Sequence, residues 1–349
     1  MNDTLDWLDG HALALDEGDV AAGQALLGRL GRSGLLRVGV PAAQGGTGGS
    51  LGDAVDAIAQ VARHSLTAAF VCWGQRAFIE YLLQSPNAAL RERALPGLLG
   101  GEEAGATGLS NAMKFLSGLE QLGVRAFGAG PWTLQGRVPW ASNLGTRFCV
   151  ALAVARDDGA PPFVVAVPAD RAGVARSADL DLIALRGSQT AALTLADVPI
   201  DDADVIHPVA REFLPRARPA FLGLQCGLSI GLAEAALGAA REHLGPARAV
   251  LGTPLTDAEA ALAAHRAELL QGLAEGRFLA DAPALFRLRI ALAQDVQQAL
   301  QLELLASGGR AYHRDQPLGF ARRWREAAFI PIVTPSLSQL QGELAKLAA

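Results

Sequence analysis

The C-terminal part of the chain carries turn and helix signals in a fixed order. It reads Gly308-Gly309-Arg310-Ala311-Tyr312, continues with Pro317-Leu318 and the run Arg322–Ala328, and ends at Val333-Thr334-Pro335. Paired glycines predict a turn, and the run that follows them has a helical period. Between Ile330 and Ser336 there is no carboxylate.

Along the remainder of the chain, the pattern of apolar residues changes twice. Apolar residues recur at spacings of three and four through the first hundred residues and again after Pro208, which predicts helices. Between about 105 and 205, short runs rich in Val, Ala and Phe alternate with Gly, Pro and Asp, which predicts strands. The expected helices are Leu5–Glu17, Val20–Arg32, Leu51–His64, Leu66–Leu83, Ala88–Leu99 and the segments around 218–243, 256–275, 280–306 and 321–345, and the expected strands include Phe148–Val154, Phe163–Val167 and Ala191–Leu195.

Composition narrows the possible classes of protein. The 349 residues are 50% hydrophobic but only 5% aromatic, so the cores are built from small aliphatic side chains. A net charge of −5 argues against nucleic acid or an anionic membrane as partner. Three dispersed cysteines and six histidines show no metal spacing, and residues 1–9 lack the basic start of a signal peptide. We expect a cytoplasmic protein with buried free thiols and no metal site.

One segment is long enough to span a membrane. Phe221 to Ala240 is nearly all apolar, but it contains Gln225 and Glu234 and has no flanking aromatic or basic belt. Helices that are apolar on every face also occur in the cores of bundles. We therefore expect a buried core helix rather than a membrane span.

Four more motifs precede the C-terminal one, and together the five resemble the acyl-CoA dehydrogenase family. Their order and spacing carry the resemblance, which extends over about residues 35–335. The four are the loop from Pro41 to Gly49, Trp140-Ala141-Ser142-Asn143, Leu185-Arg186-Gly187-Ser188-Gln189-Thr190 with Asp197-Val198-Pro199, and Arg248-Ala249-Val250-Leu251-Gly252 with Pro254-Leu255.

The resemblance implies an α+β fold in three parts. These are an N-terminal helical domain over 1–103, a middle β-barrel-like domain over 104–205 and a C-terminal four-helix bundle over 206–349. It also implies a flavin-dependent oxidoreductase that acts on a small organic or acyl substrate by hydride transfer to N5 of the flavin.

By the same resemblance, Trp140, Ser142 and Asn143 lie at the flavin, with Thr107 as a further contact. An aromatic face and a hydroxyl donor suit an oxidised flavin ring. Taken alone, the segment is more typical of a strand end with a half-buried Trp and a turn at Asn143, and it is the resemblance that favours a flavin contact. The family's acidic and glycine-rich segment after Thr107 is replaced here, so a CoA thioester does not follow from the resemblance.

By the same resemblance, Arg248, Gly308 and Gly309 are expected to bind the dinucleotide half of FAD. In the family the arginine reaches the FAD of a neighbouring subunit, which implies a homodimer or homotetramer. Two family glutamines fall here on Glu259 and Leu305. FAD is therefore the first expectation, with FMN, or reduced flavin supplied by a reductase, as the alternative.

The residue that removes a proton in the family falls on Thr334, and a second family site for it falls on Phe221. Neither side chain is a base near neutral pH. Three functions stay open: an oxidoreductase with a non-standard or absent base, a two-component monooxygenase, and a binding or regulatory protein without the chemistry. An electron-transfer protein or a flavin reductase is the expected partner of the first two.

Four residues are candidates for the substrate pocket: Gln75, Arg76, Ser110 and Phe221. Arg76 interrupts an apolar helical stretch. It is expected either to extend to the surface or to line the pocket.

Overall fold

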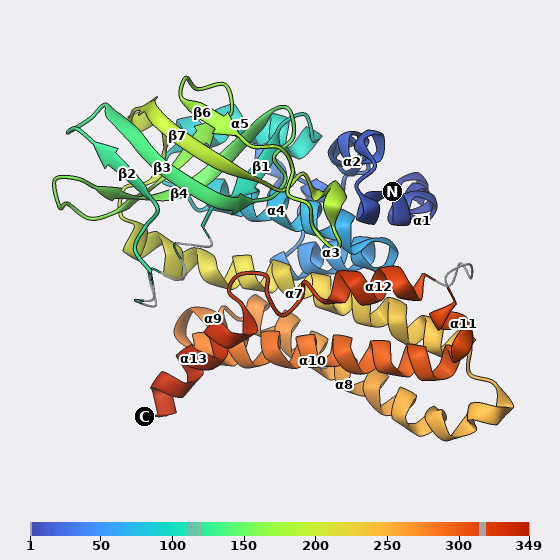
Figure 1. Ribbon diagram of the computed structural model, residues 1–349. Coiled ribbons are helices and arrows are strands. Elements are labelled where there is room, and N and C mark those ends of the chain that lie inside the picture. Colours follow the sequence, from blue (N-terminus) through green and yellow to red (C-terminus); the bar gives the residue numbers. More distant parts are fainter. Residues whose placement is uncertain are drawn as a thin grey trace.

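The computed structural model describes residues 2–109, 112, 115, 118, 120–313 and 319–348. Figure 1 shows a curled sheet beside the N-terminal helices, with the long C-terminal helices packed beneath both. The chain is therefore α+β, with helices, then strands, then helices, as expected. The N-terminal helices are α1 (Asn2–Glu17), α2 (Val20–Arg32), α3 (Leu51–His64), α4 (Leu66–Leu83) and α5 (Ala88–Gly100).

Side-chain caps fix where the N-terminal helices begin. Ser50 accepts a hydrogen bond from the Asp53 backbone while the Asp53 carboxylate accepts one from the Ser50 backbone, so α3 starts with a capping box. Ser65 ends α3 and caps α4 by accepting from the Ala68 N–H at 3.2 Å. The predicted start of α3 after Ser50 is confirmed.

The sheet consists of β1 to β8. Its order is β6-β7-β3-β2-β4-β5-β8, with β1 paired to β4, and the pairs β1–β4 and β2–β4 are parallel. The β3–β7 register shifts between Val138 and Ala141, just where β3 carries Trp140. The strands are β1 (Ala104–Thr107), β2 (Val124–Phe127), β3 (Trp132–Ala141), β4 (Phe148–Arg156), β5 (Phe163–Pro168), β6 (Val174–Arg176), β7 (Ala191–Ile200) and β8 (Val205–His207).

The C-terminal part is built around α7. Gly231 of α7 packs so closely on the α3 backbone that a Cβ there would collide with the Ala59 carbonyl. The C-terminal elements are α7 (Ala210–Glu242), the 3₁₀ segment η5 (Pro246–Leu251), α8 (Gly252–Ala274), α9 (Arg277–Ala280), α10 (Ala282–Ser307), α11 (Gly309–Tyr312), α12 (Phe320–Ala327) and α13 (Leu337–Ala348). Three long helices, α7, α8 and α10, thus pack with the shorter α12 and α13.

The most apolar window of α7 has a mean hydropathy of 1.5, and 89% of it is buried inside the protein. By length and composition α7 could cross a membrane, but its burial confirms the predicted core helix. It begins eight residues earlier than predicted, at Ala210, and includes Pro215 and Pro219.

The segment 321–345 is not the single helix that its apolar period predicts. It is divided into α12 and α13 by a turn over residues 328–336. Pro331 and Pro335 lie in this turn, and neither has the N–H that a continuous helix needs. The division matters because the turn carries Thr334.

Helix α12 joins parts of the chain that are distant in sequence. The buried Glu326 carboxylate accepts from the Leu66 N–H at 3.1 Å, at the start of α4. Arg325 pairs with Asp16 of α1 at 2.6 Å, and Asp16 also accepts from the Leu185 N–H at 2.9 Å. The turn after α12 is therefore anchored to both the N-terminal helices and the β-domain loop.

Candidate active site

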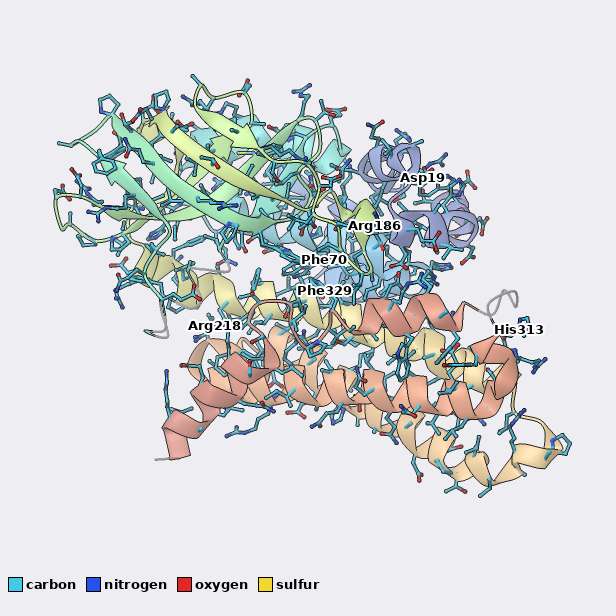
Figure 2. All side chains as sticks on the ribbon, in the orientation of Figure 1. Asp19, Phe70, Arg186, Arg218, His313 and Phe329 are labelled. Carbon is cyan, nitrogen blue, oxygen red and sulfur yellow. The ribbon has the colours of Figure 1, made fainter. Side chains whose placement is uncertain are left out.

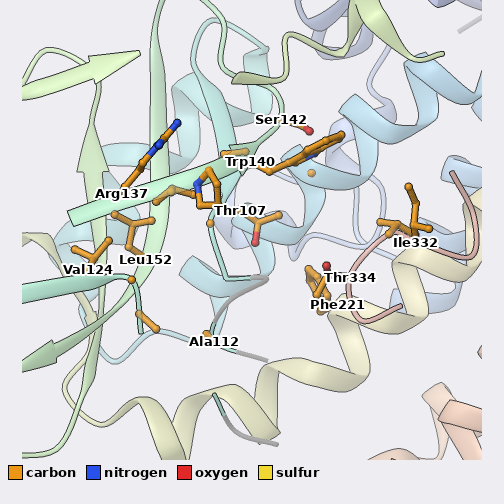
Figure 3. A pocket seen from close by; sticks show the side chains of 18 of the residues that line it. Thr107, Ala112, Val124, Arg137, Trp140, Ser142, Leu152, Phe221, Ile332 and Thr334 are labelled. Atoms are coloured by element: carbon orange, nitrogen blue, oxygen red, sulfur yellow. The ribbon is translucent and has the colours of Figure 1, made fainter. Parts of the chain in front are cut away.

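A cavity of about 490 Å³ lies where the sheet, α4, α7 and the turn after α12 meet. Figure 3 shows Arg137, Val124 and Leu152 on one side and Thr334, Phe221 and Ile332 on the other. The lining residues are Phe70, Trp73, Gly74, Thr107, Gly108, Ala112, Glu120, Gly123, Val124, Arg137, Val138, Pro139, Trp140, Ala141, Ser142, Leu152, Ala153, Phe221, Phe329, Ile332, Val333 and Thr334.

Trp140 lies on the wall formed by the end of β3. The register shift before Ala141 removes Trp140 from the regular pairing with β7, as a bulge does when it re-aims a side chain. The indole is 39% exposed, although it belongs to a cavity lined mainly by apolar side chains. A second, small cavity of about 80 Å³ shares Trp140 and Ile332 with the first. Trp140 thus presents a flat apolar surface to open space.

A chain of three hydroxyl groups lies behind this surface. The Ser142 Oγ and Thr190 Oγ1 atoms are 2.7 Å apart, and Thr190 Oγ1 is 2.8 Å from Ser188 Oγ. Ser188 and Thr190 are buried. The chain joins the motif around Trp140 to the Leu-Arg-Gly-Ser-Gln-Thr motif, and it orients the hydroxyl of Ser142, the member of the three that lines the cavity.

Thr107 is oriented in a similar way from the helical side. Its Oγ1 lies 3.0 Å from the hydroxyl of Tyr81, a fully buried residue of α4. Burial raises the pKa of Tyr81, so this phenol stays neutral. A neutral hydroxyl pair therefore fixes Thr107 at the end of β1.

Aromatic side chains form the helical wall. The Phe70 and Trp73 rings stack at 5.4 Å, and the Phe70 and Phe329 rings meet edge to face at 4.7 Å. The Trp73 indole N–H donates to the Phe221 carbonyl at 3.1 Å. Figure 2 shows Phe70 and Phe329 together at the boundary between the upper and lower layers. This wall excludes water from the deep part of the cavity.

Charge is sparse in the cavity. Among the described lining residues, Glu120 is the only acid and Arg137 the only base, and both are exposed. Thr334 stands beside Phe221 in Figure 3, so the two positions that the family uses for its base are neighbours here and hold a hydroxyl and a phenyl ring.

Gln75 and Asn143 lie behind the cavity wall rather than on it. The Gln75 amide donates to the Leu98 and Glu103 carbonyls and accepts from Gly105 N–H at 2.6 Å and Asn143 Nδ2 at 2.8 Å. Asn143 has a φ of 62°, a conformation that Asn tolerates better than most residues. Both amides hold β1 against α4 and the end of β3.

Arg76 neither extends to the surface nor lines the cavity. It is buried and pairs with Glu80 one turn later at 2.9 Å. Burial raises the pKa of Glu80, while Arg76 opposes that shift. Ser110, the remaining pocket candidate, lies outside the described residues.

Arg248, Gly308 and Gly309 come together at the start of α11. A Cβ at Gly308 would collide with the Arg248 guanidinium, so the arginine lies directly on this glycine. Gly309 begins α11, and Figure 2 shows His313, just after α11, at the extreme end of the molecule. These three residues do not line the cavity that contains Trp140.

The motif residues and the geometry can be compared with known proteins. Residues 8–102 match the family model described as the N-terminal domain of acyl-CoA dehydrogenase. The N-terminal helical part of the chain is therefore similar to that domain. No curated protein matches it in sequence.

Solved structures of this fold align over nearly the whole chain. Butyryl-CoA dehydrogenase from Megasphaera elsdenii is 19% identical, with a TM-score of 0.80, and the alignment covers 97% of this chain and 93% of that one. KijD3, in complex with FMN and an amino-keto sugar nucleotide of dTDP, is 21% identical, with a TM-score of 0.81 and coverage of 99% and 91%. Dibenzothiophene monooxygenase TdsC from Paenibacillus sp. A11-2 is 17% identical, with a TM-score of 0.75 and coverage of 98% and 94%. At these identities the likeness shows the fold.

The sequence did not indicate the hydroxyl chain from Ser142 to Ser188 or the pairing of Phe70 with Trp73 and Phe329. Ser188 and Thr190 do belong to a quoted motif, and that is the signal that could have found them. The aromatic wall had no such signal, because Phe329, in the turn after α12, and Phe221, in α7, are distant in sequence from Phe70 and Trp73 of α4.

Proposed function

We propose that the protein is a flavin-dependent oxidoreductase whose cavity holds a flavin ring against Trp140 together with a small organic or acyl substrate. The observation that carries the proposal is that four predicted site residues, distant from one another in the sequence, line the same cavity. Thr107, Trp140, Ser142 and Thr334 are separated by up to 227 positions in the sequence, yet all four line one cavity.

The residues present fit a flavin. Trp140 offers a flat apolar face in contact with open space, and the hydroxyls of Ser142 and Thr107 are held in place by buried partners. When bound, a flavin supplies the capacity to accept and donate electrons in pairs. The chain orients the ring, excludes water along the wall of Phe70 and Trp73, and presents neutral hydroxyls.

Proton removal in this cavity does not use the family's carboxylate position. Thr334 and Phe221 cannot accept a proton near neutral pH, and Glu120, the acidic lining residue, is exposed. The reaction proposed is therefore hydride transfer to the flavin from a substrate that needs no protein carboxylate at Thr334, with FAD or FMN as cofactor and a second copy of the chain at Arg248.

The apolar wall and the hydroxyl at position 334 favour a second candidate, a monooxygenase that receives reduced flavin from a separate reductase. Such a reaction needs a dry cavity with hydrogen-bond donors more than it needs a base. The resemblance in fold to KijD3 and TdsC is as compatible with a monooxygenase as with the first candidate.

Anaerobic titration distinguishes the candidates. Purified protein is titrated with oxidised and with photoreduced FMN and FAD, and the dissociation constants are compared. Tight binding of oxidised flavin supports the oxidoreductase, whereas clear preference for reduced flavin supports the monooxygenase with its reductase. Binding of neither form contradicts both and leaves a binding or regulatory protein.

A further inference from the structure

The turn that carries Thr334 is held from behind by two fully buried side chains, Gln225 of α7 and Arg289 of α10. The Gln225 amide N–H donates to the Thr334 carbonyl at 3.0 Å. Its amide oxygen accepts from Arg289 Nε at 2.9 Å, and Arg289 Nη2 donates to the Ile330 carbonyl at 2.7 Å. The Arg289 guanidinium thus holds the turn at two carbonyls. It contacts the Ile330 carbonyl directly and the Thr334 carbonyl through Gln225.

Arg289 is an unusual residue for this task. No salt bridge in the described part of the chain includes it, and its Nη1 atom has no hydrogen-bond partner there. Burial lowers the pKa of Arg289 from its usual range. A buried cation without an acidic partner is destabilising. The placement of Arg289 under the turn has an explanation if the function of the cavity depends on where the turn holds Thr334.

The amide of Gln225 has one orientation that satisfies both neighbours. Its nitrogen must face the Thr334 carbonyl, since a carbonyl only accepts, and its oxygen must face the Arg289 guanidinium, since a guanidinium only donates. Thr334 lines the cavity, and its hydroxyl makes no hydrogen bond with any other described residue. The backbone of Thr334 is fixed while its hydroxyl stays available.

We propose that Arg289 and Gln225 are positioning residues that fix the turn over 328–336, so that the Thr334 hydroxyl forms a neutral hydrogen bond to the flavin held against Trp140. The proposal rests on the proposed function, because it requires a flavin in the cavity. It assigns Thr334 a binding role in the place where the family has a base.

The variant Gln225→Glu separates positioning from packing. A glutamate keeps the size of the side chain and still accepts from Arg289, but as a carboxylate it cannot donate to the Thr334 carbonyl. Thr334→Val removes the hydroxyl at nearly constant shape. Gln271→Glu is the matched control, since Gln271 is exposed on α8 and outside the cavity lining.

FMN is the probe, with its dissociation constant and visible absorption spectrum as readouts, and hydrogen exchange of residues 328–336 is measured without flavin. Gln225→Glu and Thr334→Val are each expected to weaken FMN binding about three- to tenfold, the range of one lost hydrogen bond, and to shift the bound FMN spectrum. The double variant is expected to bind like Thr334→Val alone, because both changes act through one hydroxyl. Gln225→Glu is also expected to raise exchange in 328–336 more than elsewhere in the chain, and Gln271→Glu to match the wild type.

Three results would overturn the proposal. These are an unchanged FMN affinity and spectrum in Gln225→Glu, additive effects in the double variant, or unchanged exchange in the turn. Wild-type protein that binds neither FMN nor FAD would instead overturn the proposed function, and with it the role of Thr334. The two failures are distinguishable, because only the second appears in the wild type.

Discussion

At the scale of single residues, the account depends on Trp140. Its indole is 39% exposed inside a cavity whose other aromatic members are buried, as Phe70, Trp73 and Phe221 are, or half-buried, as Phe329 is. An aromatic ring left open to a cavity has a face without a partner, and a flavin ring would cover it. Ser142, two residues later, adds an oriented hydroxyl at the edge of the same space.

Replacement of Trp140 by Ala is expected to weaken flavin binding by about tenfold or more, because the stacking surface is lost together with its apolar contact area. Trp140→Phe is expected to bind within about threefold of the wild type. The control is Trp324→Ala, since Trp324 is similarly exposed on α12 but outside the cavity lining. Equal affinity in wild type and Trp140→Ala, measured by absorption titration, would show that the flavin lies elsewhere.

At the scale of elements, the helix starts were predicted from the sequence, whereas the turn after α12 was missed although Pro331 and Pro335 signal a break there. Ser50 and Ser65 cap α3 and α4 through hydrogen bonds to residues three positions later, and a serine before an apolar helical run can be recognised in the sequence. The apolar run from Phe329 to Val333 continues a helical period, so it concealed the turn. The turn is fixed by Gln225 and Arg289, which come from other helices, and no local pattern records them.

The candidate site also contains residues that a local motif indicates and residues that it does not. Trp140 and Ser142, which belong to one contiguous motif, were predicted to lie at the flavin, and both line the cavity. Gln75 and Arg76 were placed in the pocket on chemical type alone. In the structure Gln75 is enclosed by backbone groups and Arg76 by Glu80, since α4 turns both away from the cavity. Helical phase alone does not show which face of a wholly buried helix meets a cavity.

Glu326 makes the attachment of α12 sensitive to pH. Burial raises the pKa of Glu326, and Arg322, at 2.7 Å, opposes that shift only in part. In the unfolded chain the carboxyl ionises near its ordinary pKa of 4.5. The folded state therefore holds the extra proton above that pH, and stability is lost as pH rises from 4.5 through the folded-state pKa, at about 1.4 kcal/mol for each unit of elevation.

In Glu326→Gln this titration is absent. The melting temperature of the wild type minus that of the variant is therefore expected to fall between pH 4 and pH 7. Glu343→Gln is the control, because Glu343 pairs with Lys346 at the surface. A constant difference across this range, measured by thermal unfolding, would mean that Glu326 ionises as freely in the folded state as in the unfolded one.

At the scale of the whole molecule, the residues proposed to bind the flavin fall into two separate groups. Trp140 and Ser142 line the cavity between the sheet and the helices, whereas Arg248 lies on Gly308, directly before α11, which Figure 1 shows at one end of the helical part. One chain does not bring these groups together. If both contact one dinucleotide, a second copy of the chain must supply Arg248.

Arg248→Ala is therefore expected to weaken FAD binding about tenfold or more, as for a lost charge-assisted hydrogen bond, while leaving FMN binding unchanged. Gly308→Ala is expected to act in the same direction, because its Cβ would displace the Arg248 guanidinium from a glycine with a φ of 61°. Arg266→Ala, at the half-buried pair with Asp56, is the control. Equal losses for FAD and FMN would contradict the assignment of Arg248 to the dinucleotide half.

The most direct test of the central claim, that this cavity holds a flavin, is a crystal structure of the protein grown with FMN or FAD. We predict density for one flavin ring per chain, stacked on Trp140 with Ser142 and Thr334 at its edges. A ring bound away from Trp140, or a cavity that stays empty of flavin at saturating concentration, would contradict the account.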